Sequence, residues 1–484
     1  MKRKLLVSIL SLPAAVLALS LSACTDEKIV YQEVERKLWE EPPAGAVGFL
    51  GYAKAEEKVT ICGNCHVGQQ STWVSTAHAD AWVSLEGSGH AAATCEGCHA
   101  VSQLGNPSAI DGGWTTTSDE RYYDVQCESC HGPGQMHVNN PGASQPLAPI
   151  DVGVDLTTGC GECHNGTHHP FVEQWENSLH ATAAADGHGA SCDPCHNAAG
   201  AFAAFNVKNE YLEKASGDAT HMGIVCAVCH DPHANDNEGQ LRFPIDEPSE
   251  EGNLCMKCHH KRGTPDPTTF RGPHAPEGPL LLGVGGWWPP NMEGIGNING
   301  THGSEANPKL CAGCHMQTYT VNNPDGSFLM NAVGHDFQAT PCVDANGAPV
   351  DGPCELANKK FDGCATGGCH GSATAARSAY IVAEQRLHFL AEQLNAILNQ
   401  VQPNWATCQA ASNCPEGSPF KNGDGVYTTA EGSAFNYQMG LTTGAAAHNP
   451  FLVEALLTAS IRQMQTDYPV TVPAGVVLDN ILAK

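Results

Sequence analysis

Residues 62–82 read CGNCHVGQQSTWVSTAHADAW. The first five residues, Cys62 to His66, place two cysteines three positions apart and a histidine directly after the second cysteine. This is the attachment sequence of a c-type haem, in which the two thiols bind the vinyl groups and the adjacent imidazole ligates the iron as the proximal ligand. The stretch therefore predicts a covalently bound haem, and it makes His78 a candidate for the opposite, distal position on an iron.

The same motif recurs along the chain. Seven further copies of Cys-x-x-Cys-His follow, and a wider ninth version, CATGGCH, ends at His370. Zinc sites and iron–sulfur clusters also use cysteine pairs, but neither needs a histidine after every pair. We therefore expect nine haems c. The expected attachment cysteines are Cys62, Cys65, Cys95, Cys98, Cys127, Cys130, Cys160, Cys163, Cys192, Cys195, Cys226, Cys229, Cys255, Cys258, Cys311, Cys314, Cys364 and Cys369. The expected proximal ligands are His66, His99, His131, His164, His196, His230, His259, His315 and His370.

Five cysteines lie outside these motifs. Cys24 belongs to the N-terminal region, and the remaining four form an even set, which suits an exported protein in an oxidising compartment. The neighbours Cys342 with Cys354, and Cys408 with Cys414, are the expected disulfides, although other connectivities stay open at this point.

The N-terminus has the pattern of an export signal. Three basic residues at positions 2–4 precede an apolar stretch, and the sequence LSAC at residues 21–24 resembles a bacterial lipobox. We expect residues 1–23 to be a lipoprotein signal peptide, Cys24 to carry lipid, and residues 24–60 to form a tether. The alternative is an ordinary signal peptide followed by an unrelated cysteine. No other apolar run is long enough to cross a bilayer.

The charge balance limits the classes of partner. The chain of 484 residues has 51 acidic and 24 basic residues, a formal net charge of −27. Such a surface disfavours nucleic-acid binding because phosphate and carboxylate charges repel each other. We instead expect redox partner proteins, a membrane reached through the lipid anchor, and an extracellular or metal-oxide acceptor as a further candidate.

An internal repeat divides the chain. The first cysteines of motifs one to three recur as those of motifs four to six, about one hundred residues later, which predicts tri-haem repeats at residues 61–158 and 159–250. Residues 251–372 then carry haems seven to nine, and residues 373–484 form a C-terminal region. Histidines recur at matching places in the two repeats, and a recurring histidine is a better distal candidate than a lone one. The recurring candidates are His78 with His180, His90 with His188, and His137 with His233.

The fold class follows from the shortage of apolar residues within each repeat. Units this short cannot bury an independent core, so the porphyrins must supply the buried apolar material. We predict a mainly α protein with extensive coil, a multihaem cytochrome c fold built around packed haems. After residue 372 the pattern becomes helical: an apolar stripe runs from Tyr380 to Val401, with His388 beside it, and Asn449 and Pro450 favour the start of a second helix.

The sequence resembles the multihaem c-type cytochromes of respiratory bacteria, especially those related to the tetrahaem acceptor of hydroxylamine oxidoreductase. The fragments WVSTAHA at 73–79, WENSLHA at 175–181 and CESCHGPGQMHV at 127–138 carry this resemblance. It implies closely packed haems that exchange electrons. It also implies further distal ligands at His274, His335 and His448, and we add His302 as one more candidate.

Three functions are compatible with these features. The leading one is a nonahaem electron carrier in anaerobic or extracellular respiration, exported as a lipoprotein to the outer membrane, either on its periplasmic face or at the cell surface. Two histidines on each iron would suppress ligand chemistry and favour one-electron exchange. The alternatives are a multihaem oxidoreductase acting on a nitrogen or sulfur compound, and a subunit of a haem filament. In related nitrite reductases the catalytic motif ends in lysine, whereas all nine motifs here end in histidine; hydroxylamine-oxidising relatives keep the histidine, so the enzyme alternative stays open.

Overall fold

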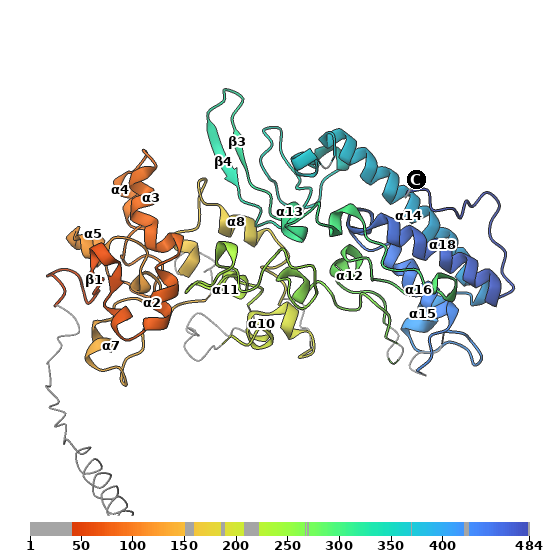
Figure 1. The fold of residues 1–484 in the computed structure, drawn as a ribbon, viewed down its shortest axis with the longest axis horizontal. Helices are drawn as coiled ribbons and strands as arrows, with labels where there is room; N and C mark the ends of the chain where they lie inside the picture. Colours follow the sequence, from red (N-terminus) through yellow and green to blue (C-terminus); the bar gives the residue numbers. More distant parts are fainter. Residues whose placement is uncertain are drawn as a thin grey trace, which may run out of the picture. The chain divides into compact units, whose positions relative to one another are not determined.

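The computed structural model describes residues 41–150, 159–184, 189–207, 222–266, 268, 271–368, 370–420 and 425–482. Across them the protein is mainly helical with extensive coil, as predicted, and its strands form two small antiparallel pairs (Figure 1). Strand β1 (Tyr52–Lys54) pairs with β2 (Val59–Thr60), and β3 (Tyr319–Asn322) pairs with β4 (Phe328–Ala332). In the part of the chain described here, none of the helices combines the length and apolar character needed to span a bilayer.

Most helices before residue 373 are only one or two turns long. The α-helices of this region are α2 (Val67–Trp73), α3 (Ala81–Gly87), α4 (Ala93–Glu96), α5 (Trp114–Thr117), α6 (Cys127–His131), α7 (Gln135–Asn139), α8 (Phe171–Glu176), α9 (Asp193–His196), α10 (Ala198–Ala204), α11 (Cys226–Cys229), α12 (Glu277–Leu281) and α13 (Leu310–His315). The 3-10 helices are η1 (Ala55–Glu57), η2 (Cys62–Asn64), η3 (Ala77–Asp80), η4 (Glu120–Tyr122), η5 (Gly159–Glu162), η6 (Glu238–Gln240), η7 (Cys255–Lys257), η8 (Pro290–Met292), η9 (Thr301–Gly303), η10 (Leu356–Asn358) and η11 (Asp362–Gly368).

The tether expected for residues 24–60 does not extend over residues 41–60, which are folded. Phe49 and Leu50 are fully buried. The backbone N–H groups of Leu50 and Gly51 donate to the carboxylate of Glu128, inside the third cysteine motif, as does that of Gly134. Burial raises the pKa of Glu128 to about 7, against these donors, which lower it. The rest of the expected tether, the signal peptide and Cys24 lie outside the described residues.

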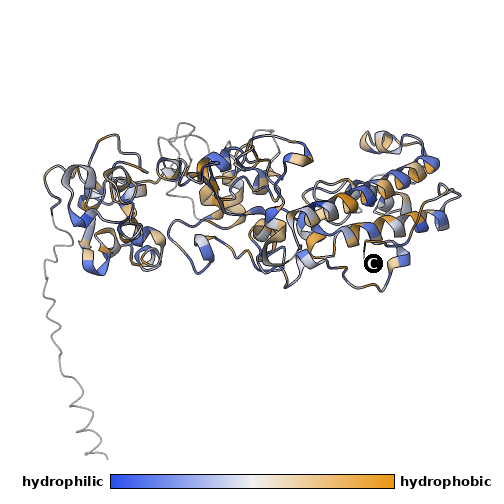
Figure 2. Ribbon diagram, turned by 90° about the horizontal axis from the view of Figure 1, so that it is seen from above, coloured by the Kyte–Doolittle hydropathy of each residue, from blue (hydrophilic) through white to orange (hydrophobic). Residues whose placement is uncertain are grey.

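The C-terminal region holds the largest apolar core of the described chain. Helices α14 (Ala373–Val401), α16 (Thr429–Gly440) and α18 (Pro450–Asp467) pack against one another, with the short α15 (Trp405–Ala410) and α17 (Ala445–His448) beside them (Figure 1). The predicted stripe of α14 faces inward, because Leu387, Leu390 and Leu394 are all buried. In Figure 2 the hydrophobic colour follows these helices, whereas before α14 it is scattered over short helices and loops. An aliphatic core therefore exists where the cysteine motifs end.

Local capping explains where the C-terminal helices begin. Asn449 caps α18 through its side-chain oxygen, which accepts from the Leu452 N–H at 3.0 Å, and Pro450 occupies the first turn, as predicted. Helix α16 was not predicted, although Thr428 and Glu431 form a capping box at its start. Its residues are buried around most of its circumference, so it lacks the one-sided apolar pattern that marks an amphipathic helix.

Disulfides join Cys342 to Cys354 and Cys408 to Cys414, the two pairs of sequence neighbours considered above. The first closes a twelve-residue separation just before the ninth motif, and the second closes a six-residue separation just after α15 begins. Each cross-link closes a short loop and restricts the unfolded chain.

Candidate haem sites

Each cysteine motif folds as about one helical turn. We number the sites 1 to 9 in chain order. At sites 1, 4, 6 and 7 the backbone N–H of the histidine donates to the carbonyl of the first cysteine at 2.9–3.0 Å. This i to i−4 hydrogen bond places the two cysteines and the histidine on a single turn. The turn therefore presents both thiols and the imidazole together, as covalent haem attachment requires.

Eight of the nine proximal histidines face a second imidazole. In each case the partner comes from elsewhere in the chain, and the ring centres lie 6.0–6.3 Å apart. The pairs are His66 with His137 at site 1, His131 with His233 at site 3, His164 with His78 at site 4, His196 with His274 at site 5, His230 with His335 at site 6, His259 with His180 at site 7, His315 with His448 at site 8 and His370 with His302 at site 9.

This separation has a direct chemical meaning. A histidine nitrogen lies about 2.0–2.1 Å from a bound metal, and the ring centre lies roughly 1.1 Å behind that nitrogen. Two imidazoles on opposite sides of one iron therefore have ring centres about 6.3 Å apart. Aromatic ring pairs in general have centroids anywhere from about 4.5 to 7 Å apart, whereas these eight pairs all fall within 6.0–6.3 Å. The eight pairs fit a six-coordinate haem iron between them.

The tautomer of several ligands is fixed by backbone carbonyls. The Nδ1 atom of His131 lies 2.7 Å from the Pro146 carbonyl oxygen, that of His230 lies 2.7 Å from Gly239 O, and that of His315 lies 2.7 Å from Phe337 O. A carbonyl oxygen only accepts, so Nδ1 must carry the proton and donate. The lone pair is then on Nε2, which is left free for a metal. The hydrogen bond from Nδ1 to the carbonyl also holds the orientation of the ring.

Burial keeps other ligands uncharged. Burial first, together with the positive charges of neighbouring histidines, lowers the pKa of His164, His180 and His448 to about 4. A neutral imidazole is the form that binds metals. His259 differs because its hydrogen bond to the Glu277 carboxylate raises its pKa. A Glu277 carboxylate oxygen lies 3.4 Å from the Nδ1 atom of His259. At the other sites described above, a backbone carbonyl oxygen contacts this same ring nitrogen.

The attachment cysteines of different sites lie close to one another. Five pairs are within hydrogen-bonding reach: Cys62 with Cys127, Cys98 with Cys163, Cys160 with Cys226, Cys195 with Cys258, and Cys255 with Cys311. Further pairs interact electrostatically: Cys130 with Cys160 and Cys163, and Cys229 with Cys255 and Cys258. Sites 1, 3, 4, 6, 7 and 8 thus form a continuous series, with site 2 beside site 4 and site 5 beside site 7.

These interactions between attachment cysteines also show the internal repeat in three dimensions. The neighbour relations among sites 1 to 4 recur among sites 4 to 7, each shifted by three sites. Site 9 joins the series at site 8, because the Nδ1 atom of its ligand His302 donates to the carbonyl of Ala447, the residue before His448. The described attachment sites therefore make one connected set.

The sequence-derived distal candidates differ in their outcome. Nine of the ten are described, and eight of these lie in the pairs given above. His90 is the exception: its side chain is exposed, and the described residues offer it no imidazole contact. Its repeat partner His188 and the attachment residue Cys369 lie outside the described residues. The alignment of the repeats thus selected His78 and His180, which face proximal histidines. It selected His90 equally, although His90 has no such partner among the described residues.

Equivalent histidines in the repeats do not always face equivalent sites. His78 and His180 face sites 4 and 7, three sites apart, as the repeat demands. His137 faces site 1, however, whereas the aligned His233 faces site 3. Site 4 takes its second histidine from the preceding repeat. Site 1 has no repeat before it in this chain, and a histidine from its own repeat fills the place.

Comparisons with known proteins agree with this geometry. Residues 61–132 match the family described as cytochrome c554 and c-prime, and residues 218–264 match the doubled CXXCH motif. This is a multihaem c-type cytochrome. The cytochrome is also similar to the multiheme cytochrome MtrA of Shewanella baltica (strain OS185), with 26% identity over 198 residues, 35% of this chain and 53% of the relative. It therefore spans about half the length of that relative. No solved structure matches it significantly.

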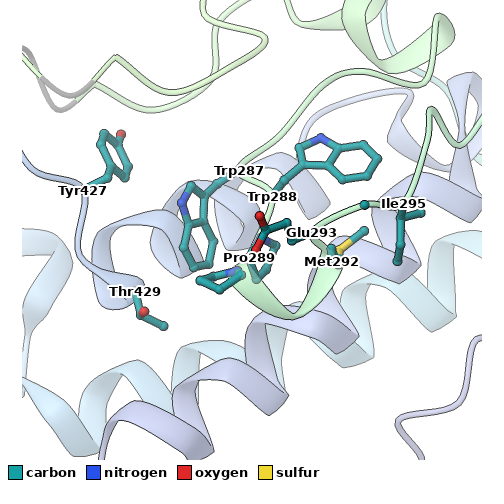
Figure 3. A pocket seen from close by; sticks show the side chains of 10 residues that line it. Trp287, Trp288, Pro289, Met292, Glu293, Ile295, Tyr427 and Thr429 are labelled. Atoms are coloured by element: carbon teal, nitrogen blue, oxygen red, sulfur yellow. The ribbon is translucent and has the colours of Figure 1, made fainter.

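A pocket of about 590 Å³ lies at the edge of the cytochrome's C-terminal helices (Figure 3). Trp287, Trp288 and Met292 line it from the segment before site 8, and Tyr427 and Thr429 line it from the start of α16. No cysteine or histidine is among its lining residues. The pocket is therefore not one of the attachment sites.

Proposed function

We propose that this cytochrome binds nine haems c and transfers electrons between redox partner proteins in anaerobic or extracellular respiration. The observation that carries the proposal is the set of eight imidazole pairs with ring centres 6.0–6.3 Å apart. Bound haem would supply reversible one-electron exchange at iron. The chain contributes two imidazoles to each of these irons, which leaves no position open for a substrate.

The order of the attachment sites supports long-range conduction. The cysteine contacts place sites 1, 3, 4, 6, 7 and 8 in succession, and the hydrogen bond from His302 adds site 9. Sites 2 and 5 lie to the side of this series, next to sites 4 and 7. We propose that the series from site 1 to site 9 is the main route through the protein and that sites 2 and 5 are branches.

The acidic composition and the N-terminal sequence suggest where the protein works. A formal net charge of −27 favours association with cationic partner surfaces over nucleic acid. We propose that Cys24 anchors the protein as an exported lipoprotein at the outer membrane, where an extracellular acceptor would be within reach. Loss of membrane fractionation in a normally processed Cys24→Ser variant tests this anchor, and unchanged fractionation would exclude it.

Haem stoichiometry and ligation test the electron-carrier function together. We expect nine haems per chain by intact mass and pyridine haemochrome absorbance, since nine motifs are present. Electron paramagnetic resonance of the oxidised protein is expected to show only low-spin haem, with negligible binding of cyanide or nitrite. A count of eight would remove site 9, the site with the wide motif. A stoichiometric high-spin haem that turns over hydroxylamine, nitrite or sulfite would instead establish an enzyme.

A further inference from the structure

Site 2 differs from the other sites in the surroundings of its proximal histidine. The Nδ1 atom of His99 lies 2.9 Å from the Ala81 carbonyl oxygen, so Nδ1 donates and Nε2 is left for the iron. In the described part of the chain, however, no second imidazole lies at the separation found for the other eight sites. The candidate that the repeat suggested, His90, makes no ring contact with another imidazole in the described part of the chain.

Another histidine lies near His99. His169 follows the fourth motif by five residues, and its pKa is lowered first by burial, then by the charge of His99 and then by that of its sequence neighbour His168. The ring centres of His168 and His169 are 6.5 Å apart. Cys98, the second cysteine of site 2, contacts the fourth motif, because its thiol donates to the Glu162 carbonyl oxygen at 4.0 Å; site 2 therefore lies next to the motif that His169 follows.

Three sites further along the chain, at site 5, the corresponding proximal histidine does face a second imidazole. Site 5 corresponds to site 2, and its His196 faces His274 with ring centres 6.0 Å apart. His274 follows the seventh motif, and His169 follows the fourth, which is the corresponding motif three sites earlier. The attachment cysteines agree as well. Cys98 of site 2 interacts with Cys163 of site 4, and Cys195 of site 5 interacts with Cys258 of site 7.

The backbone around these two histidines is also alike. His169 directly precedes Pro170, the N-cap of α8, and His274 lies two residues before Pro276, the N-cap of α12. In both helices the second residue donates its N–H to the carbonyl of the preceding proximal histidine: Val172 to His164 at 3.2 Å, and Gly278 to His259 at 2.8 Å. A similar local fold therefore follows the fourth and the seventh motifs, with a histidine one residue before the N-cap proline in the first case and two residues before it in the second.

We propose that His169 is the second axial ligand of the haem bound at Cys95, Cys98 and His99. The assignment rests on the proposed function, because it requires haem attachment at site 2. It completes two imidazoles at every site, and it replaces His90 as the ligand there. The neighbouring His168 is held elsewhere: its ring stacks on Phe328 of β4 with centres 4.7 Å apart, and its carbonyl accepts from the Asn331 side chain.

The test compares the spin states of four holoprotein variants. His169→Ala is expected to convert one haem equivalent from low to high spin at an unchanged haem count by mass. His168→Ala and His90→Ala are matched controls, expected to stay wholly low spin. His169→Met is expected to restore low spin and to raise the potential of one haem, because a thioether replaces an imidazole.

The outcomes separate this inference from the proposed function. A Cys95→Ser and Cys98→Ser double variant should lose one haem by mass, and adding His169→Ala to it should then create no high-spin signal. If the double variant keeps every haem, attachment at site 2 fails, and with it the proposed count of nine. If attachment holds but His169→Ala stays low spin, or if His90→Ala alone produces the high-spin haem, His169 is not the ligand. A high-spin haem already present in the native protein and unaffected by His169→Ala would also overturn the assignment.

Discussion

Replacing His180 with alanine is expected to convert one haem equivalent from low spin to high spin, with no change in the covalent haem count. The ring of His180 lies 6.2 Å from that of His259, the proximal histidine of site 7; His180 is partly buried, and His259 is exposed. Alanine removes the second imidazole of this pair, so the iron would be left five-coordinate. Electron paramagnetic resonance measures the change, and intact mass verifies the nine thioether-linked haems.

The chain supplies two matched comparisons for this variant. His78 has the equivalent place in the first repeat, facing His164 at 6.1 Å, so His78→Ala should affect a different haem and the double variant should show two high-spin equivalents. His260 adjoins site 7 in the sequence but belongs to none of the eight imidazole pairs, so His260→Ala should leave every haem low spin. Free imidazole should restore low spin to His180→Ala. Wholly low-spin spectra for both His78→Ala and His180→Ala would contradict the pairing.

Glu454→Ala is expected to destabilise the C-terminal helices by about 3–5 kcal/mol, the usual cost of leaving one partner of a buried ion pair alone. Arg386 of α14 and Glu454 of α18 are buried, and the Arg386 Nε lies 2.7 Å from a Glu454 carboxylate oxygen. The same carboxylate accepts from the backbone N–H groups of Ile481 and Leu482. Chemical denaturation followed by far-ultraviolet circular dichroism measures the loss.

An exposed ion pair of the same chain is the control. Lys54 and Glu57 lie 3.3 Å apart, but both side chains are more than half exposed, so Glu57→Ala should cost less than about 1 kcal/mol. Arg386 also donates to the carbonyls of Val477 and Asp479, so the pair holds the C-terminal segment against two helices. Equal stability of the Glu454→Ala and native proteins would show that this network makes no net contribution.

The sequence alone identified what covalent chemistry dictates. A motif such as Cys62 to His66 specifies its haem through five adjacent residues, because attachment and proximal ligation depend on one turn of backbone. The apolar stripe of α14 and the cap of α18 at Asn449 were also predicted from the sequence, since both depend on local spacing and local hydrogen bonds. The same reasoning failed for α16, whose nearly uniform burial leaves no periodic pattern.

The distal histidines could be predicted from the sequence only in part, and the reason is physical. His180 and His259 are 79 positions apart in the sequence numbering, and His302 and His370 are 68 apart, so no local rule connects them. The repeat supplied candidates but could not separate His78, which faces an iron site, from His90, which is exposed. It also could not show that residues 41–60 fold against Glu128, since hydrogen bonds from Leu50 to Glu128 span 78 residues.

The sequence by itself thus identified the cofactor and the helical C-terminus and predicted the attachment residues, because each is encoded in residues that are neighbours along the chain. The tertiary structure alone decided which imidazole faces which proximal histidine and the order in which the sites adjoin, as in the contacts of Cys98 with Cys163 and of Cys195 with Cys258. Those relations join distant segments, and only the packing of one repeat against the next brings their side chains to within a metal's reach.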